Sequence, residues 1–143
     1  MIIRKYTKED INKIVSLEEE SLGHSLGYDF LESYLSNMMA YIYVIDDNND
    51  IIGYVSTVFD GEIIEILNFC ISPKRRRCHL GENLLNHVFS ELKKYGAKSS
   101  FLEVRDDNVA AISLYSKLGY KKINVRKQYY SDGCDAQVLQ LIF

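Results

Sequence analysis

Residues 65–95 constrain the possible fold more than any other part of the chain. They begin with an apolar run, rich in β-branched and aromatic side chains, that stops before Pro73 and is typical of a buried strand. Apolar residues then recur at helical spacing from Leu80 to Tyr95, and Gly96 follows where such a helix would end. The segment therefore predicts a strand, a turn and a helix in succession.

The turn between this strand and this helix is basic. Three consecutive arginines, Arg75–Arg77, precede Gly81 in the first turn of the predicted helix. A helix start has N–H groups without internal partners, its dipole favours an anion, and arginines add phosphate contacts. The pattern favours a binding site for a phosphorylated cofactor. A solvated basic turn and a nucleic-acid patch are the alternatives, although the net charge of −3 is unlike that of most nucleic-acid-binding domains.

Length and composition describe one ordinary globular domain. A chain of 143 residues, 47% hydrophobic and 26% charged, can bury a core without disulfides or metals. We therefore expect a single domain over residues 1–143. No apolar run approaches the roughly 20 residues that span a bilayer, and the N-terminus lacks the pattern of a signal peptide. These features predict a cytoplasmic protein without a membrane partner.

The cysteines point to the same compartment. Cys70, Cys78 and Cys134 cannot all pair within the chain, and their spacing matches no zinc motif. The three histidines form no ligand cluster with them, so we expect no metal. Free thiols in a reducing cytoplasm are the simplest interpretation. Cys78 lies in the basic turn, where a passive small residue is favoured over a reactive thiol.

The N-terminal part predicts a strand followed by two helices. Residues 2–6 predict the strand, and residues 7–10 resemble a capping box before an apolar helical stripe. The acidic run 18–20 falls where this helix ends, and a solvated helix face is its expected environment. Residues 22–28 contain two glycines and predict a loop. Asp29 then caps a second helix, whose predicted apolar face consists of Phe30, Tyr34, Leu35 and Met38.

The remaining segments predict strands and one more helix. Two strands flank the helix that follows the basic turn, which predicts a parallel pair with a right-handed crossover. The predicted fold is therefore α/β (α+β), with a mixed, mostly antiparallel sheet covered by helices. The further strands are expected at 41–45, 51–59, 100–104, 120–127 and 135–143, and the further helix at 109–118.

Two groups of residues match the motifs of one known family. Arg76–Gly81 aligns with the loop motif Gln/Arg-x-x-Gly-x-Gly/Ala, with His79 at the first glycine. The second group consists of Leu102–Arg105, Asn108, Ala110–Ile112, Leu114–Tyr115, Leu118–Tyr120, Arg126, Tyr129–Tyr130, Asp132–Gly133 and Asp135–Ala136. With the element order, these motifs resemble the GNAT family of N-acetyltransferases, in particular the RimI-type ribosomal-protein alanine N-acetyltransferases and their archaeal and eukaryotic amino-terminal relatives. The resemblance implies a GNAT fold whose central parallel strands splay apart.

The resemblance implies acetyl-CoA as co-substrate, lying between the splayed strands. The main chain of Phe69, Cys70 and Ile71 would contact the pantetheine arm, although their side chains also suit a simple core. Asn108 would contact the coenzyme in addition to capping a helix. The Cβ of histidine at the glycine position predicts weaker, not abolished, binding. The diphosphate would be held by main-chain N–H groups of Arg76, Arg77, Cys78, His79, Leu80, Gly81 and Glu82.

Acetyl transfer to an amine requires the neutral amine. Roughly a tenth of a free α-amino group is neutral at pH 7 because its pKa is near 8, whereas a lysine near 10.4 needs more help. The resemblance assigns Glu103 as the base and Tyr115 as the group that protonates the departing thiol. An ion pair is the alternative role for Glu103, and a core position is the alternative for Tyr115. A phenol near pKa 10 is also a weak acid towards a thiolate near 8.5.

The resemblance places the acceptor between the loop 22–28 and the segment after the last helix. Tyr28, Tyr129, Tyr130 and Asp135 are the candidate substrate-binding residues. The implied acceptor is a protein or peptide N-terminus, with the N-terminal alanine of a ribosomal protein as leading candidate, acetylated directly in a ternary complex. We expect a monomer or weak homodimer without nucleic acid. Three alternatives stay open: acetylation of a lysine or small-molecule amine, a non-catalytic acyl-CoA-binding or interaction module, and a nucleic-acid-binding module.

Overall fold

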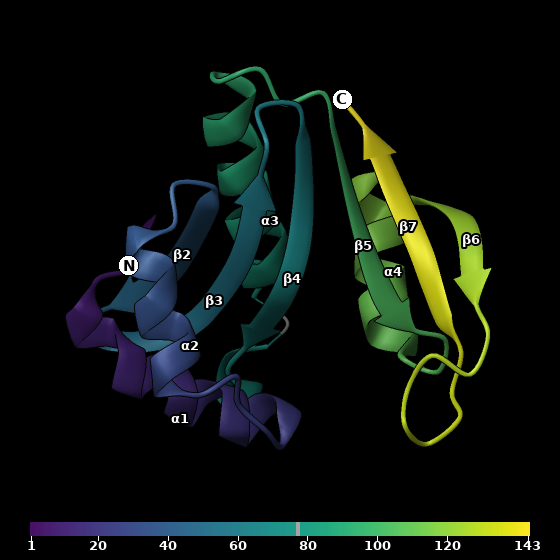
Figure 1. Ribbon diagram of the computed structural model, residues 1–143. Helices are drawn as coiled ribbons and strands as arrows, with labels where there is room; N and C mark the ends of the chain where they lie inside the picture. Colours follow the sequence, from purple (N-terminus) through teal and green to yellow (C-terminus); the bar gives the residue numbers. More distant parts are fainter. Residues whose placement is uncertain (77) are drawn as a thin grey trace.

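The computed structural model describes residues 1–76 and 78–143, which form a seven-stranded sheet in the order β1-β2-β3-β4-β5-β7-β6 (Figure 1). Of its strand pairs, β4 and β5 run parallel and the others antiparallel. This arrangement confirms the predicted mixed α/β fold and element order. The strands are β1 (Ile2–Lys5), β2 (Ala40–Asp47), β3 (Asp50–Phe59), β4 (Ile63–Ile71), β5 (Ser99–Arg105), β6 (Lys121–Arg126) and β7 (Ala136–Ile142), and the α-helices are α1 (Ile11–Leu22), α2 (Tyr28–Ser33), α3 (Leu80–Lys93) and α4 (Val109–Leu118).

Helices cover both faces of the sheet (Figure 1). α3 and α4 pack on one face, where Leu84 and Leu85 of α3 are fully buried. α1 and α2 pack on the other face over a second core that includes Ile11. Consecutive strand residues supply the two cores in turn, as Tyr43 and Val44 of β2 do, because side chains alternate across a sheet. No helix within residues 1–76 and 78–143 is long and apolar enough to cross a membrane.

The second helix differs from its prediction. The expected cap at Asp29 is wrong, because α2 begins at Tyr28 after Gly27, whose φ of 91° requires a residue without a Cβ. α2 has six residues, and Leu31 is the one that it buries. The predicted apolar face does not form, since Met38 is 93% exposed and lies beyond the end of the helix.

The first helix begins as predicted and ends in an unexpected environment. The capping box is present at residues 7–10, where Asp10 Oδ2 accepts the Thr7 N–H at 2.7 Å. The acidic run 18–20 was expected to be a solvated face, but Glu18 is 0% exposed. That expectation is therefore wrong for Glu18, and hydrogen bonds from other elements, described below, account for its burial.

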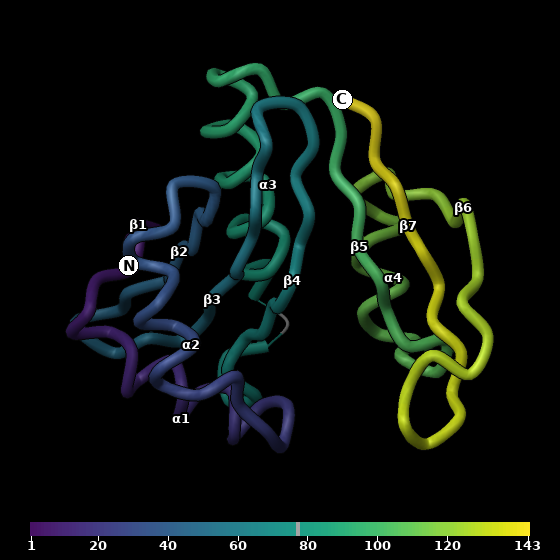
Figure 2. Tube along the Cα trace, viewed as in Figure 1, coloured from purple at the N-terminus to yellow at the C-terminus, as the bar shows by residue number. Residues whose placement is uncertain are grey.

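The parallel strands β4 and β5 pair at one end and diverge towards the other (Figure 2). Their register joins Ile63–Ile66 to Ser99–Leu102 and does not extend further. Leu67–Ile71 and Glu103–Arg105 therefore form the two arms of an opening in the sheet, and the tube trace shows these arms separating downwards. This opening positions the candidate site.

A β-bulge lies where β4 leaves β5. In the pairing with β3, Asn68 opposes Ser56 and Ile66 opposes Thr57, so Leu67 is the extra residue. The bulge shifts the alternation of the side chains that follow. Cys70 consequently packs in the core beneath α1 and α2, whereas Phe69 packs on the side of α3 and α4.

Candidate active site

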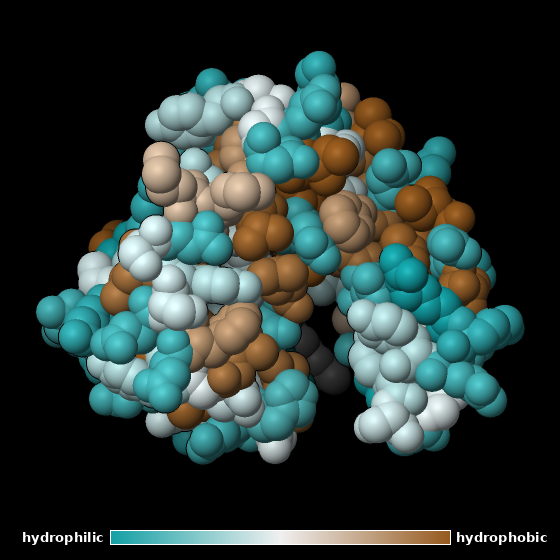
Figure 3. Space-filling view, viewed as in Figure 1, coloured by the Kyte–Doolittle hydropathy of each residue, from teal (hydrophilic) through white to brown (hydrophobic). Residues whose placement is uncertain are grey.

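A cleft of about 1050 Å³ occupies the opening between β4 and β5. Figure 3 shows the corresponding hollow between the two halves of the molecule. Its walls come from both strands, the end of α1, the start of α3 and one face of α4. The predicted site residues in its lining are Phe69, Cys70, Ile71, Arg76, His79, Leu80, Gly81, Glu82, Glu103, Asn108, Tyr115, Tyr129 and Tyr130.

The start of α3 forms one wall of the cleft. The first backbone hydrogen bond of this helix runs from Asn83 N to His79 O. The N–H groups of residues 80–82 therefore have no acceptor within the helix. Arg76 lies beside them and donates from Nε to the Ile71 carbonyl at 3.4 Å. Together with the helix dipole, these N–H groups form a site that suits a phosphate.

The backbone conformation of His79 explains why the family motif has a glycine at this position. The residue is left-handed, with φ 57° and ψ 19°, a conformation that a Cβ disfavours. Its imidazole is mostly exposed, with Nδ1 3.6 Å from the Glu82 carboxylate. A Lys117 hydrogen bond at 3.1 Å, together with His79, lowers the pKa of Glu82. Histidine therefore keeps the loop shape while adding backbone strain and bulk.

We expect His79→Gly to raise the stability of the protein by up to about 1 kcal/mol. Relief of left-handed strain contributes about 1–2 kcal/mol, and the larger unfolded-state entropy of glycine offsets part of it. Urea unfolding measures the change. His79→Ala is the matched control, because it removes the imidazole and retains the Cβ. A gain in His79→Ala equal to that in His79→Gly would contradict the strain explanation.

Gly81 permits close contact between α3 and β4. A Cβ built on Gly81 would lie 2.8 Å from Phe69 Cζ and 3.4 Å from Leu114 Cδ2, and the shorter distance is below normal contact. The Phe69 ring also approaches Tyr115, with 6.3 Å between ring centroids. Gly81 therefore determines how near the Phe69 ring lies to the helix start.

We expect Gly81→Ala to weaken binding of acetyl-CoA, the co-substrate that the resemblance implies, by roughly tenfold, about 1.4 kcal/mol, with little loss of stability. The new methyl group displaces the Phe69 ring towards the cleft, whereas the higher helix propensity of alanine offsets the strain. Isothermal titration of acetyl-CoA measures the affinity. The double variant Gly81→Ala/Phe69→Leu provides room for the methyl group and should bind better than Gly81→Ala alone. Equal affinities would show that the Phe69 contact is not the cause.

Main-chain groups of β4 face the opening in alternation. Ser72 N donates to Ile52 O at 2.7 Å, which places Ser72 and Cys70 in hydrogen-bonded pairs with β3. Phe69 and Ile71 therefore direct their N–H and C=O groups towards the opening. The main chain of Cys70 faces β3, and burial raises the pKa of its thiol to about 12.

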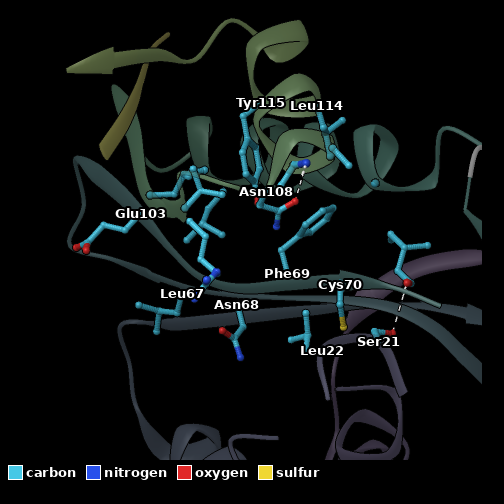
Figure 4. Close-up of a pocket in the computed structure, with 18 of the residues that line it drawn as sticks. Ser21, Leu22, Leu67, Asn68, Phe69, Cys70, Glu103, Asn108, Leu114 and Tyr115 are labelled. Carbon is cyan, nitrogen blue, oxygen red and sulfur yellow. Dashed lines mark hydrogen bonds between the residues drawn. The ribbon is translucent and has the colours of Figure 1, made fainter. Parts of the chain in front are cut away.

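Asn108 begins α4 at the edge of the cleft. Its Oδ1 accepts the Ala111 N–H at 3.1 Å, so the predicted helix cap is present. Asn108 also lines the cleft, and Figure 4 shows it next to Phe69. Capping and an additional contact within the cleft are therefore compatible.

Glu103 presents a carboxylate at the other end of the cleft from Cys70 (Figure 4). Its neighbours Leu102 and Val104 point into the core, so alternation turns Glu103 to the opposite face. Its Oε2 is shielded from solvent and accepts no hydrogen bond from the described residues. Arg126 Nε lies 3.3 Å from this oxygen, so the ion pair considered from the sequence is present.

A second carboxylate lies on the same face as Glu103. Glu65 of β4 lines the cleft, and burial together with the nearby Glu103 charge raises its pKa. The close approach of Glu103 also raises the pKa of Tyr129, whose ring lies 5.9 Å from the Arg126 guanidinium. This end of the cleft is therefore acidic, which suits a cationic amine.

Tyr115 reaches the cleft from α4. Its side chain is buried between aromatic neighbours, 6.3 Å from the Phe69 ring and 5.6 Å from the Tyr120 ring. Its hydroxyl has no hydrogen-bond partner among residues 1–76 and 78–143, although the side chain lines the cleft. Burial raises the pKa of Tyr115 well above its ordinary value near 10. The hydroxyl thus stays protonated and is free to donate.

The segment between β6 and β7 closes one side of the cleft. Tyr129 and Tyr130 line the cleft from this segment. Arg105 holds the segment at the end of β5, because its Nη2 donates to Asp132 at 2.7 Å. The Arg105 guanidinium also lies over the Tyr130 ring, 4.9 Å from the centroid.

Some predicted site residues lie elsewhere. Tyr28 begins α2 and packs against the core beneath it. Asp135 accepts the Gln128 N–H at 2.8 Å and so shapes the β6–β7 segment from outside the cleft. Cys78 is exposed and is not among the cleft-lining residues. Arg77 lies outside the described residues.

Residues that the sequence interpretation missed also line the cleft. Glu65 and Leu67 come from β4, and Ser21, Leu22 and His24 come from the end of α1 and the loop that follows. The apolar neighbours Ile64 and Ile66, which turn Glu65 to the opposite face by strand alternation, were a usable signal. The α1 residues had no such signal, because their place depends on how α1 packs across the sheet.

Comparisons with known proteins agree with this geometry. Residues 8–120 match the acetyltransferase (GNAT) family. The chain is 30% identical to an N-alpha-acetyltransferase of Sulfolobus acidocaldarius, over 96% of this chain and 89% of the relative. It is 32% identical to a putative [ribosomal protein bS18]-alanine N-acetyltransferase of Bacillus subtilis, over 96% of this chain and 92% of the relative.

A solved structure gives the same result. The crystal structure of the ribosomal-protein-S18-alanine N-acetyltransferase from Escherichia coli superposes with a TM-score of 0.89 and 28% sequence identity. The match covers 99% of this chain and 92% of that chain. The similarity therefore extends over the whole sheet, including the opening that forms the cleft.

Proposed function

This chain belongs to the acetyltransferase (GNAT) family, and on that basis we propose that it transfers the acetyl group of acetyl-CoA to the α-amino group of a protein N-terminus. The observation that supports this function best is the composition of one cleft. Main-chain groups of β4 and the start of α3 suit pantetheine and diphosphate, and a shielded carboxylate, Glu103, lies at the far end. Such an arrangement brings a thioester and an amine to the same point.

The reaction is a direct transfer in a ternary complex. The lone pair of the neutral amine attacks the thioester carbonyl carbon, the new C–N bond forms, and the C–S bond then breaks. Glu103 accepts the proton that the nitrogen loses, directly or through one water. The thiolate of coenzyme A leaves beside Tyr115, which donates a hydrogen bond to the sulfur. The products are the acetylated amine and coenzyme A, whose thiolate takes up a proton from solvent while Glu103 releases its own proton to solvent.

The proposed acceptor is an N-terminal alanine of a ribosomal protein. The names of the Bacillus subtilis and Escherichia coli relatives specify such an alanine, and the Sulfolobus relative is named for α-amines in general. An α-amine also suits the chemistry, because roughly a tenth of it is already neutral at pH 7, far more than for lysine. The acidic end of the cleft, with Glu65 and Glu103, would attract the ammonium form before deprotonation.

The release of coenzyme A with matched peptides tests the proposal. One peptide begins with a free alanine and contains an internal lysine, and its partner is identical except for an acetylated α-amine. We expect turnover with the first peptide and background release with the second. Equal turnover with both would overturn the assignment of the α-amine and favour lysine. Initial rates with both substrates varied should give intersecting lines, whereas parallel lines would indicate an acyl-enzyme.

A further inference from the structure

Glu18 is a buried acid that the proposed reaction does not use. It lies in α1, four residues before the helix ends at Leu22, and is 0% exposed. Its Oε2 accepts the Tyr54 hydroxyl at 2.6 Å and Asn68 Nδ2 at 2.9 Å. Its Oε1 accepts the Ser25 hydroxyl at 2.9 Å. Within residues 1–76 and 78–143, no cation lies within ion-pair distance of this carboxylate.

The hydrogen-bond donors join two parts of the acceptor side of the cleft. Ser25 belongs to the loop between α1 and α2, and its Oγ also accepts the Gly27 N–H at 2.9 Å, just before α2. Asn68 follows the bulged Leu67, and its own N–H donates to Ser56 Oγ at 3.1 Å. Figure 4 shows Asn68 pointing away from Phe69, on the α1 side of β4.

The buried Glu18 carboxylate fixes how the surrounding elements are arranged, and its chemistry explains why. A carboxylate removed from water without a cation costs free energy, and an apolar side chain would fill the same space in this core more cheaply. A fully hydrogen-bonded polar network in a low dielectric instead selects one arrangement of the elements that it joins. Here those elements are α1, the α1–α2 loop, β3 and the bulge of β4.

We propose that Glu18 is a positioning residue that couples the α1–α2 loop to the bulge of β4. Leu22 and Leu67 lie beside the two joined parts, line the cleft and are about one-third exposed, at 38% and 36%. The coupling sets the separation of these walls and their position relative to Glu103. That this wall holds the acceptor rests on the proposed function, whereas the coupling itself does not.

Hydrogen–deuterium exchange tests the coupling without any substrate. Asn68→Ala on β4 should speed exchange of the loop amides at residues 24–28 by roughly tenfold, although Asn68 makes no hydrogen bond to that loop. Glu18→Ala should have the same effect, and the neighbouring exposed acid Glu19, changed to alanine, is the matched control. Unchanged loop exchange in Asn68→Ala, or equal acceleration in Glu19→Ala, would overturn the proposal.

The conservative substitution Glu18→Gln should preserve the hydrogen bonds and the slow exchange of the loop. Its amide oxygen can accept both the Tyr54 and Asn68 donors, while its NH₂ group donates to Ser25. Loop exchange should therefore stay within about threefold of the wild-type rate, well short of the roughly tenfold acceleration expected for Glu18→Ala. Exchange as fast in Glu18→Gln as in Glu18→Ala would contradict a network that works through hydrogen bonding.

Steady-state kinetics test the consequence for the acceptor. Ser25→Ala should raise the KM for an alanine-starting peptide about 3- to 10-fold, with kcat and acetyl-CoA affinity held. Equal losses of acetyl-CoA affinity and peptide KM would show general damage and refute the positioning role. Absence of turnover in the wild type would instead contradict the proposed function, and the exchange experiment would still decide the coupling.

Discussion

Glu103→Gln should lower kcat at pH 7 by about 100-fold or more, because an amide cannot accept the proton that the amine loses. The substitution is nearly isosteric, and Glu103 lies at the end of the cleft opposite Cys70 (Figure 4), so acetyl-CoA affinity should not change. The deficit should shrink as the pH rises towards 8, because more of the α-amine is then already neutral. Rates with saturating peptide between pH 6 and 9 measure both effects.

Glu65→Gln is the control for this prediction. Glu65 shares the acidic end of the cleft, where burial and, to a lesser extent, the nearby Glu103 charge raise its pKa. Its loss should cost less, about tenfold, mainly in the KM of a cationic acceptor. If Glu65→Gln lowered kcat about 100-fold and Glu103→Gln kept near wild-type turnover, the base would be Glu65 of β4 and not Glu103.

Tyr115→Phe should lower kcat about 10- to 100-fold while leaving acetyl-CoA affinity nearly unchanged, because the lost hydrogen bond matters most when the sulfur becomes negative. Burial raises the pKa of Tyr115 above its ordinary value, so the hydroxyl stays protonated throughout the usual assay range. No loss of activity below pH 10 should therefore arise from this group. The pH profiles of the wild type and of Tyr115→Phe should run parallel up to that pH.

Tyr120→Phe separates this catalytic effect from packing. Tyr120 is also buried, lies against the Tyr115 ring and exchanges a hydrogen bond with Ser100 at 2.7 Å. Its substitution should reduce stability by about 1 kcal/mol and leave kcat unchanged. If Tyr115→Phe retained full kcat, or lost it only in proportion to its stability, the donor role would be wrong.

Local signals predicted the elements that frame the cleft. α4 has the predicted bounds, because Asn108 caps its start and Gly119, with φ 104°, ends it. The strand and the helix within residues 65–95 also form, since each depends on nearby residues. The resemblance to the family added the positions within the cleft of Glu103 and Tyr115, which spacing alone could not supply.

Features that depend on distant residues could not be predicted. The acidic run at 18–20 has the pattern of a solvated face, and the burial of Glu18 depends on Tyr54 and Asn68, which are 36 and 50 residues away. The bulge at Leu67 has no local sequence signal, yet it turns Asn68 towards α1. Tertiary contacts of this kind determine this wall of the cleft.

The most direct test of the proposed function is to locate the transferred acetyl group. The purified protein is incubated with acetyl-CoA and a peptide that begins with alanine and contains a lysine, and fragment-ion mass spectrometry assigns the modified nitrogen. The proposed function predicts acetate on the α-amine, and roughly 100-fold less of it with Glu103→Gln. Acetate on the lysine alone, or equal α-amine acetylation by Glu103→Gln, would contradict it.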